Sequence, residues 1–208
     1  MEGDYLGEVL SDIKKYPIIA AIRDIEKIDL ALEKPLRCLF LLTGNILNIK
    51  YAVTHIRKAR KRAFVHIDLL EGVSKDSMGI KYLAEEVKPD GIITTRGNLI
   101  SCAKSEGIFT IQRVFILDSL AKDTAEKSIN QVDPDAVEIL PGVIPKIISK
   151  IHREVHYPVI AGGLIETLDE VKAALKEGAL AVSISKEELW DEIPYEDLEK
   201  RRKSSSGR

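Results

Sequence analysis

The chain has little of what marks secreted, metal-binding or membrane-spanning proteins. Its two cysteines, Cys38 and Cys102, lie far apart without a CxxC pair, so the sequence predicts neither a zinc site nor a disulfide framework. No apolar run approaches the roughly 20 residues that span a bilayer. The first residues also lack the basic region and the apolar stretch of a signal peptide. We therefore expect a cytoplasmic protein with no membrane partner.

The chain also has no excess of charge of either sign. Its 208 residues carry a net charge of −2, which gives no general attraction toward nucleic acids or membranes. Aromatic residues make up only 5% of the chain, and no motif of base-stacking aromatics is visible. Binding of RNA or another polyanion would therefore have to come from a local cluster of basic side chains.

Common catalytic motifs are missing as well. The sequence contains no GxSxG, no HExxH, no P-loop and no dinucleotide-binding fingerprint. It also lacks the Asp-x-Lys-x-x-Asp arrangement of phosphosugar decarboxylases. An acid or base among Asp68, Glu71 and Glu138 would still suffice for an isomerisation, so an enzyme remains an alternative.

What the chain does contain is a regular alternation of short apolar runs and segments of helical period. The apolar runs cover residues 18–22, 36–42, 63–70, 90–95, 108–115, 135–140, 158–163 and 180–185. Runs that are apolar on both faces suit parallel strands covered on both sides, and strict alternation with helices indicates repeated βαβ units. None of these runs holds a lysine, which disfavours a Schiff-base aldolase.

Eight βαβ units predict a protein of the α/β class with a compact TIM (β/α)8 barrel as its single domain. An open, doubly wound sheet is the competing architecture, and the strand count does not exclude it. We expect residues 1–16 to form a helical extension that closes the barrel floor, and residues 17–192 to form the barrel. Residues 193–208 read as a basic, disordered tail.

Charged residues collect where the predicted strands end, which is the functional face of such barrels. The candidates for a ligand pocket are Arg23, His66, Asp68, Glu71, Arg96, Arg113 and Glu138. Period-2 alternation places His66 and Asp68 on one face of their strand, although a buried, hydrogen-bonded histidine is an equally good interpretation. Glu138 lies in an apolar run and needs a partner, which Arg113 or Arg96 would supply in a binding or a purely structural role.

These side chains suit a small, polar, anionic ligand better than a metal ion. Asp68 and Glu71 with one histidine make no specific metal motif, and we expect neither a metal nor a cofactor.

The stretch VIAGGLIET, residues 159–167, predicts a strand that ends at two glycines before a helix. Thr167 and Glu170 have the spacing of a capping box, so the helix should begin near residue 168. Gly162 and Gly163 leave backbone N–H groups accessible, and a short helix after Ser185 would direct further N–H groups to the same point. The predicted phosphate site comprises Gly162, Gly163, Ser183 and Ser185. The alternative is that the glycines only permit close packing.

The strongest basic cluster lies at the end of the helix predicted after the second strand. It consists of Arg57, Lys58, Arg60, Lys61 and Arg62, which could form a stripe on that helix that contacts RNA phosphates. The alternative is a solvated helix C-terminus, where cations complement the helix dipole.

Several segments together resemble the glycerol-responsive antiterminator family. They are PIIAAIRDIEKI, FVHIDLLEGVSKD, GIKYLAEEVKPDGIITTRGNLI, TIQRVFILDS, VEILPGVIPKII, PVIAGGLIET and AVSISKEELW. The likeness runs from about Tyr16 to Trp190 and departs slightly at the eighth strand, where SIS replaces the STS or TTS common in the family.

The resemblance implies a TIM barrel that binds glycerol 3-phosphate and acts on leader mRNA, so that transcription passes a terminator ahead of glycerol genes. It implies that Gly162, Gly163 and Ser185 hold the phosphate. The individual roles of the charged pocket residues are our assignments from their chemistry. Homo-oligomerisation is compatible with this function. The alternatives are an enzyme of isomerase or lyase type on a small phosphorylated substrate, and a ligand-binding barrel whose output is another protein.

Overall fold

The structure is a computed structural model that describes residues 2–192. Its eight strands are β1 (Ile18–Ile22), β2 (Cys38–Leu41), β3 (Arg62–His66), β4 (Gly91–Thr94), β5 (Phe109–Phe115), β6 (Ala136–Leu140), β7 (Val159–Gly162) and β8 (Ala181–Ile184). All pair in parallel and in sequence order, and β8 closes the barrel on β1 with Ile184 beside Ala20. The predicted TIM barrel is therefore confirmed, and the open sheet is excluded.

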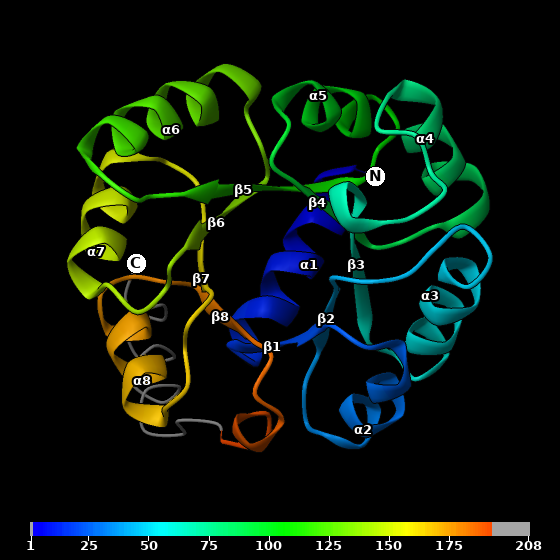
Figure 1. Ribbon diagram of the computed structural model, residues 1–208, viewed down its shortest axis with the longest axis horizontal. Helices are drawn as coiled ribbons and strands as arrows, with labels where there is room; N and C mark the ends of the chain where they lie inside the picture. Colours follow the sequence, from blue (N-terminus) through cyan, green and yellow to red (C-terminus); the bar gives the residue numbers. More distant parts are fainter. Residues whose placement is uncertain (1, 193–208) are drawn as a thin grey trace.

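Helices surround the ring of strands (Figure 1). The α-helices are α1 (Glu2–Lys15), α2 (Ile28–Glu33), α3 (Ile49–Lys58), α4 (Ser77–Tyr82), α5 (Gly97–Ser105), α6 (Ser119–Val132), α7 (Pro145–Glu154) and α8 (Leu168–Lys176). Shorter elements are η1 (Ile25–Lys27), η2 (Ile67–Leu69), the π-helical turn η3 (Leu83–Val87) and η4 (Glu187–Leu189). Within residues 2–192, no helix is both long and apolar enough to cross a membrane.

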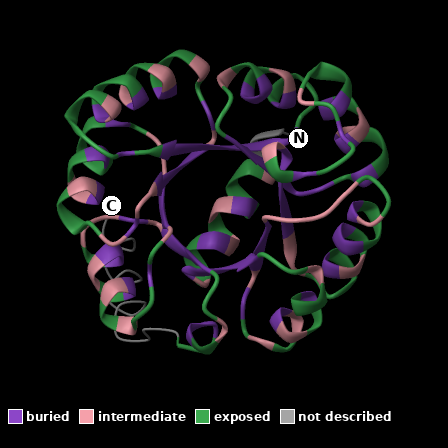
Figure 2. Ribbon diagram, viewed as in Figure 1, coloured by how far each residue is buried: buried purple, intermediate pink, exposed green. Residues whose placement is uncertain are grey.

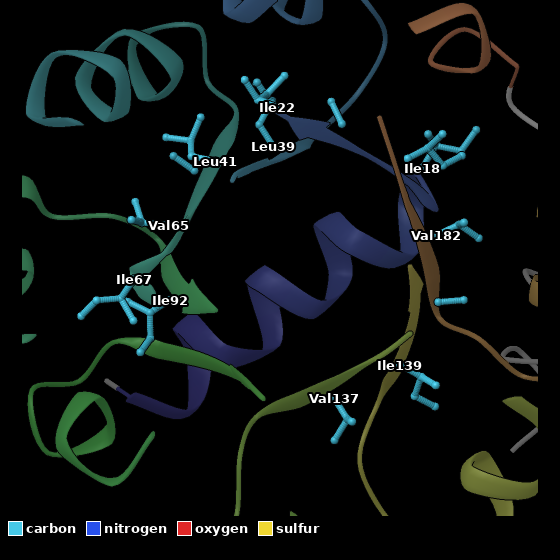
Figure 3. Packing of buried hydrophobic residues seen from close by; sticks show 14 of the residues in the cluster. Ile18, Ile22, Leu39, Leu41, Val65, Ile67, Ile92, Val137, Ile139 and Val182 are labelled. Carbon is cyan, nitrogen blue, oxygen red and sulfur yellow. The ribbon is translucent and has the colours of Figure 1, made fainter. Parts of the chain in front are cut away.

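Strand side chains alternate between two apolar layers. Ile22, Leu41 and Val65 belong to the layer that packs outward between the barrel and its helices (Figure 3). The inward layer includes Phe40, whose ring meets that of Phe64 edge to face at 5.4 Å between centroids. The outer helices bury their inner sides and expose their outer sides (Figure 2), which is the amphipathic pattern expected from the sequence.

Helix α1 closes the amino-terminal end of the barrel. It lies across the middle of the ring of strands (Figure 1), and its Val9 and Ile13 are fully buried in the same cluster as the inward strand residues. Arg62 at the start of β3 joins this helix to the barrel, because its Nε lies 2.9 Å from Asp12 Oδ2 and its Nη1 lies 3.2 Å from Asp90 Oδ1.

The third strand is shorter than its apolar run predicts. The strand predicted over 63–70 is wrong beyond His66, because η2 turns the chain there, so strand alternation does not place Asp68. The basic tail predicted over 193–208 lies outside the described residues.

Candidate functional site

A cavity of about 420 Å³ opens at the carboxyl ends of the strands, between β1 and β5–β8. Six predicted site residues line it: Arg23, Arg113, Glu138, Gly163, Ser183 and Ser185. The rest of its wall is mainly apolar and consists of Ala21, Leu42, Phe115, Leu117, Leu140, Pro141, Leu164, Ile165 and Ile184. The cavity is thus a small apolar pocket with a few converging polar groups, the usual form of a small-molecule site.

A buried polar cluster centred on Glu138 borders the cavity. Register pairs Arg113 of β5 with Glu138 of β6, and the Arg113 Nε donates to Glu138 Oε2 at 2.6 Å. The hydroxyl of Ser183 donates to the other carboxylate oxygen at 2.6 Å. Both oxygens of this fully buried carboxylate are therefore hydrogen-bonded, which offsets the cost of its burial.

The two glycines at the end of β7 differ in their surroundings: Gly162 is the last residue of the strand, and Gly163 follows it. A Cβ on Gly162 would lie 2.5 Å from Ser183 Oγ and 2.6 Å from Glu138 Oε1, so a glycine is needed here to make room for the polar cluster. Gly162 is outside the cavity lining, whereas Gly163 lines the cavity and has a φ of +78°, which favours glycine. The next residue, Leu164, also has a positive φ, +60°, so the chain turns sharply over the cavity mouth.

Of the two helix starts predicted beside the glycines, the one at Thr167 is as expected and the one after Ser185 is shorter. The capping box is confirmed, because Glu170 N donates to Thr167 Oγ1 at 3.3 Å and Thr167 N donates to Glu170 Oε2 at 3.0 Å. The short helix expected after Ser185 is only the three-residue 3₁₀ turn η4.

Arg23 provides a free cation at the cavity mouth. Its side chain is exposed, and it forms no ion pair with any described residue, unlike Arg113 deeper in the cavity. An anionic ligand could therefore pair with Arg23 without displacing an internal carboxylate.

Two further predicted pocket residues, Asp68 and Arg96, form a second cluster at the ends of β3 and β4, outside the cavity lining. Asp68 accepts hydrogen bonds from the Thr94 hydroxyl at 2.8 Å and from the Thr95 N–H at 2.7 Å. Arg96 Nε lies 3.7 Å from the same carboxylate. Burial alone would raise the pKa of Asp68, but the hydrogen bonds from Thr95 and Thr94 outweigh it and hold this pKa below its ordinary value.

His66 lies between the two clusters and is buried. Burial, reinforced by the positive charge of Arg113, lowers the pKa of His66 to about 4 against the opposing attraction of Asp68. His66 is therefore uncharged at neutral pH. Its Nδ1 has no hydrogen-bond partner among the described residues, so the ring is not the satisfied core histidine of the alternative interpretation.

Sequence reasoning missed Lys75, which belongs to the loop after η2. Its ammonium donates to the carbonyl of Leu70 and, at 2.9 Å, to that of Val73, and it lies close enough to Asp68 for their charges to interact. Glu71, in contrast, is exposed. No group of three metal-ligating side chains occurs in residues 2–192.

The residues of the predicted basic stripe do not all lie on one helix, so that placement is wrong, whereas their contact with RNA stays a prediction. Helix α3 ends at Lys58, Arg60 takes a left-handed conformation with φ +59°, and Arg62 begins β3. Arg57 donates to the Lys88 carbonyl at 2.6 Å, and Lys61 donates to the carbonyls of Lys34 and, at 3.1 Å, of Ala31. Hydrogen bonds or ion pairs thus tie the side chains of Arg57, Lys61 and Arg62 to other segments of the protein.

Fold and cavity together define a single (β/α)8 barrel with a small, mainly apolar site that holds a few polar groups at the carboxyl ends of its strands. The chain belongs to the glycerol-3-phosphate responsive antiterminator family, whose model matches residues 18–190.

Solved structures agree with this membership. A glycerol uptake operon antiterminator regulatory protein from Listeria monocytogenes is 38% identical, with a TM-score of 0.81 over 84% of this chain and 94% of that one. A glycerol uptake operon antiterminator-related protein from Thermotoga maritima is 34% identical, with a TM-score of 0.75 over 84% of this chain and 98% of that one. The uncharacterized protein YgcP of Escherichia coli strain K12 is 36% identical over 86% of this chain and 93% of its own.

Proposed function

We propose that this protein binds glycerol 3-phosphate in the cavity at the carboxyl end of its barrel and regulates transcription by binding leader mRNA in response. The family description supports the ligand, and the names of the Listeria and Thermotoga proteins support a role in glycerol operons.

The unpaired Arg23 on the same cavity wall as Gly163 and Ser185 carries the ligand assignment. A phosphate dianion placed between them gains an arginine, a hydroxyl and the backbone of a glycine turn, which is the donor set that phosphates prefer. The glycerol hydroxyls then lie toward Glu138, whose carboxylate is oriented by Arg113 and Ser183 and keeps lone pairs free to accept further hydrogen bonds.

Regulation requires that the ligand distinguish two forms of the protein. Binding at the turn formed by Gly163 and Leu164 favours the conformation in which this turn lies over the phosphate, and that form binds RNA better. The ligand can shift the balance only by its difference in affinity for the two forms.

Calorimetric titration with glycerol 3-phosphate, glycerol and inorganic phosphate tests the ligand. We expect glycerol 3-phosphate to bind at least about tenfold tighter than either fragment, because it occupies both halves of the site. The Arg23→Gln variant should weaken binding by about tenfold or more. Arg153→Gln, which removes an exposed arginine from the last turn of α7, is the matched control.

A gel shift on the leader transcript upstream of the protein's own gene, with and without glycerol 3-phosphate, tests the output. Tighter RNA binding in the presence of the ligand supports the proposal, and ligand binding without any RNA complex contradicts it. Turnover of glycerol 3-phosphate or a triose phosphate that vanishes in Asp68→Asn would favour the enzyme alternative.

A further inference from the structure

The amino-terminal end of the barrel, opposite the cavity, carries a concentration of cations beneath β1–β4. Six of them form no ion pair among the described residues: Lys14, Lys15, Arg37, Lys58, Arg60 and Lys88. We call this group the floor surface. It combines the C-terminus of α1, the start of β2, the end of α3 and the residue after η3, so no short stretch of sequence contains it.

A cation–π contact and two hydrogen bonds show that these elements adjoin one another. The Arg37 guanidinium lies 5.2 Å from the centre of the Tyr16 ring, which joins the end of α1 to the start of β2. The carbonyl of Arg37 accepts from Arg62 N at 2.8 Å, and the carbonyl of Lys88 accepts from Arg57 at 2.6 Å. The floor surface is therefore continuous from α1 to the start of β4.

Several carboxylates at this end of the barrel pair with other cations, whereas Glu33 at the end of α2 is exposed and forms no ion pair with a described residue. Glu8, Asp12 and Asp90 surround Arg62, and Asp191 pairs with Lys34. The six cations of the floor surface thus have no carboxylate of the described residues in an ion pair with them, in a protein whose net charge is −2.

Two floor cations occupy positions where the backbone favours glycine. Residues 2–192 include four non-glycine residues with positive φ, and two of them are Arg60 at +59° and Lys88 at +55°. Each follows the end of a helical segment, where glycine is the common residue because it adopts this conformation without strain. An exposed cation therefore stands at each of these two helix ends, where the left-handed conformation fixes the direction of the backbone.

The floor surface is also poor in exposed apolar side chains. Eleven large apolar residues are exposed in the described chain, and Leu6 of α1 is the one on the floor side. The other ten end a strand, follow its carboxyl end or lie in the first turn of the next helix: Ile46, Leu47, Tyr51, Leu69, Met78, Phe115, Leu117, Leu120, Ile144 and Leu164. A polar, positive surface suits a nucleic acid better than a protein partner.

We propose that the floor surface is the RNA-binding face of this protein and contacts the phosphate backbone of the leader transcript. The inference rests on the proposed function, and it places RNA at the end of the barrel opposite glycerol 3-phosphate. Tyr16 is half-buried, and the Arg37 guanidinium lies over its ring, so this pair fixes Arg37 on the α1 side of the proposed face.

The test compares two triple variants in the gel shift on the leader transcript. The floor variant is Arg37→Glu/Arg60→Glu/Lys88→Glu, and the control is Lys127→Glu/Lys146→Glu/Lys172→Glu, which reverses three exposed lysines on α6, α7 and α8. Both change the net charge equally. We expect RNA affinity to fall by about 100-fold in the floor variant and by less than about threefold in the control.

Two further measurements separate the inference from the proposed function. Loss of three phosphate contacts should reduce the slope of log affinity against log salt by about 2 for a single strand. The floor variant should also bind glycerol 3-phosphate like the wild type, which shows that the barrel is intact. If the two variants bind RNA with equal affinity, the floor surface is not the RNA-binding face, while the proposed function stands. Absence of RNA binding by the wild type overturns both.

Discussion

The Nε atom of Arg113 lies 2.6 Å from Oε2 of Glu138, and both side chains are buried beside the ligand cavity. This ion pair joins neighbouring strands of the barrel, and Ser183 of β8 completes it. Its burial makes the site a rigid part of the core, so changes to its members affect stability and ligand binding together.

Removing one partner of this pair should be far more harmful than removing both. We expect Arg113→Met to lower the free energy of unfolding by about 3–5 kcal/mol, because it leaves a buried carboxylate without a countercharge. The double variant Arg113→Met/Glu138→Leu should recover much of this loss. Urea denaturation monitored by circular dichroism gives both values, and a single variant as stable as the wild type would contradict the ion pair.

A negative charge at residue 163 should expel the ligand without unfolding the barrel. Gly163→Asp and Gly163→Asn place side chains of the same shape at a φ of +78°, so both should lose about 1 kcal/mol of stability. Only the aspartate repels a phosphate. Calorimetry should therefore find glycerol 3-phosphate affinity at least about tenfold weaker in Gly163→Asp than in Gly163→Asn. Equal affinities would mean that Gly163 serves only the turn.

Stability should fall at acidic pH because of His66. Its pKa is lowered from 6.5 to about 4 in the folded protein, so the unfolded chain takes up the proton first as the pH falls. The contribution of uncharged His66 to the free energy of unfolding is complete above pH 6.5 and is lost as the pH falls toward 4. We expect a loss of about 2.5 kcal/mol between pH 7.5 and 4.5.

Urea denaturation at several pH values measures this loss. The His66→Gln variant should show a flatter profile over this range. His156→Gln, which removes an exposed histidine, is the control and should retain the steep one. A wild-type profile that stays flat down to pH 4.5 would contradict the buried, uncharged state of His66.

The same substitution should change the free energy of unfolding strongly at Arg62 and hardly at all at Arg60. Arg62→Gln removes the ion pairs to Asp12 and to the buried Asp90, so we expect a loss of about 3 kcal/mol or more in the free energy of unfolding. Arg60→Gln removes an exposed side chain without an ion pair and should stay within about 0.5 kcal/mol of the wild type. Thermal unfolding distinguishes the two, and similar melting temperatures would refute the role of Arg62 in fastening α1.

The fold could be predicted from the sequence because each strand and helix has a pattern of apolar residues within its own short segment. Apolar runs and helical periods repeat along the chain, and all eight strands appear within the predicted runs or one residue from them. The turn at Ile67–Leu69 was missed because the apolar run continues through it, and periodicity alone does not reveal where such a run leaves the sheet.

The site was harder to predict because its partners are distant in sequence. Arg113 and Arg96 were equal candidates for Glu138, and only the strand register selects Arg113, whereas Arg96 faces Asp68. Arg62 was grouped with its basic neighbours because its partners lie 50 residues before it, at Asp12, and 28 residues after it, at Asp90. A local pattern of charge does not show which cations an acidic partner already neutralises.

The seam between β1 and β8 sets the order of events during synthesis. Ile19 of the first strand pairs with Ser183 of the last, so the ring cannot close until β8 has left the ribosome. Helix α1 emerges first, but the interior that buries Val9 and Ile13 forms last. Arg23 and Ser183 stand on opposite sides of this seam. A nascent chain interrupted before β8 therefore lacks the part of the cavity wall that Ser183, Ile184 and Ser185 form.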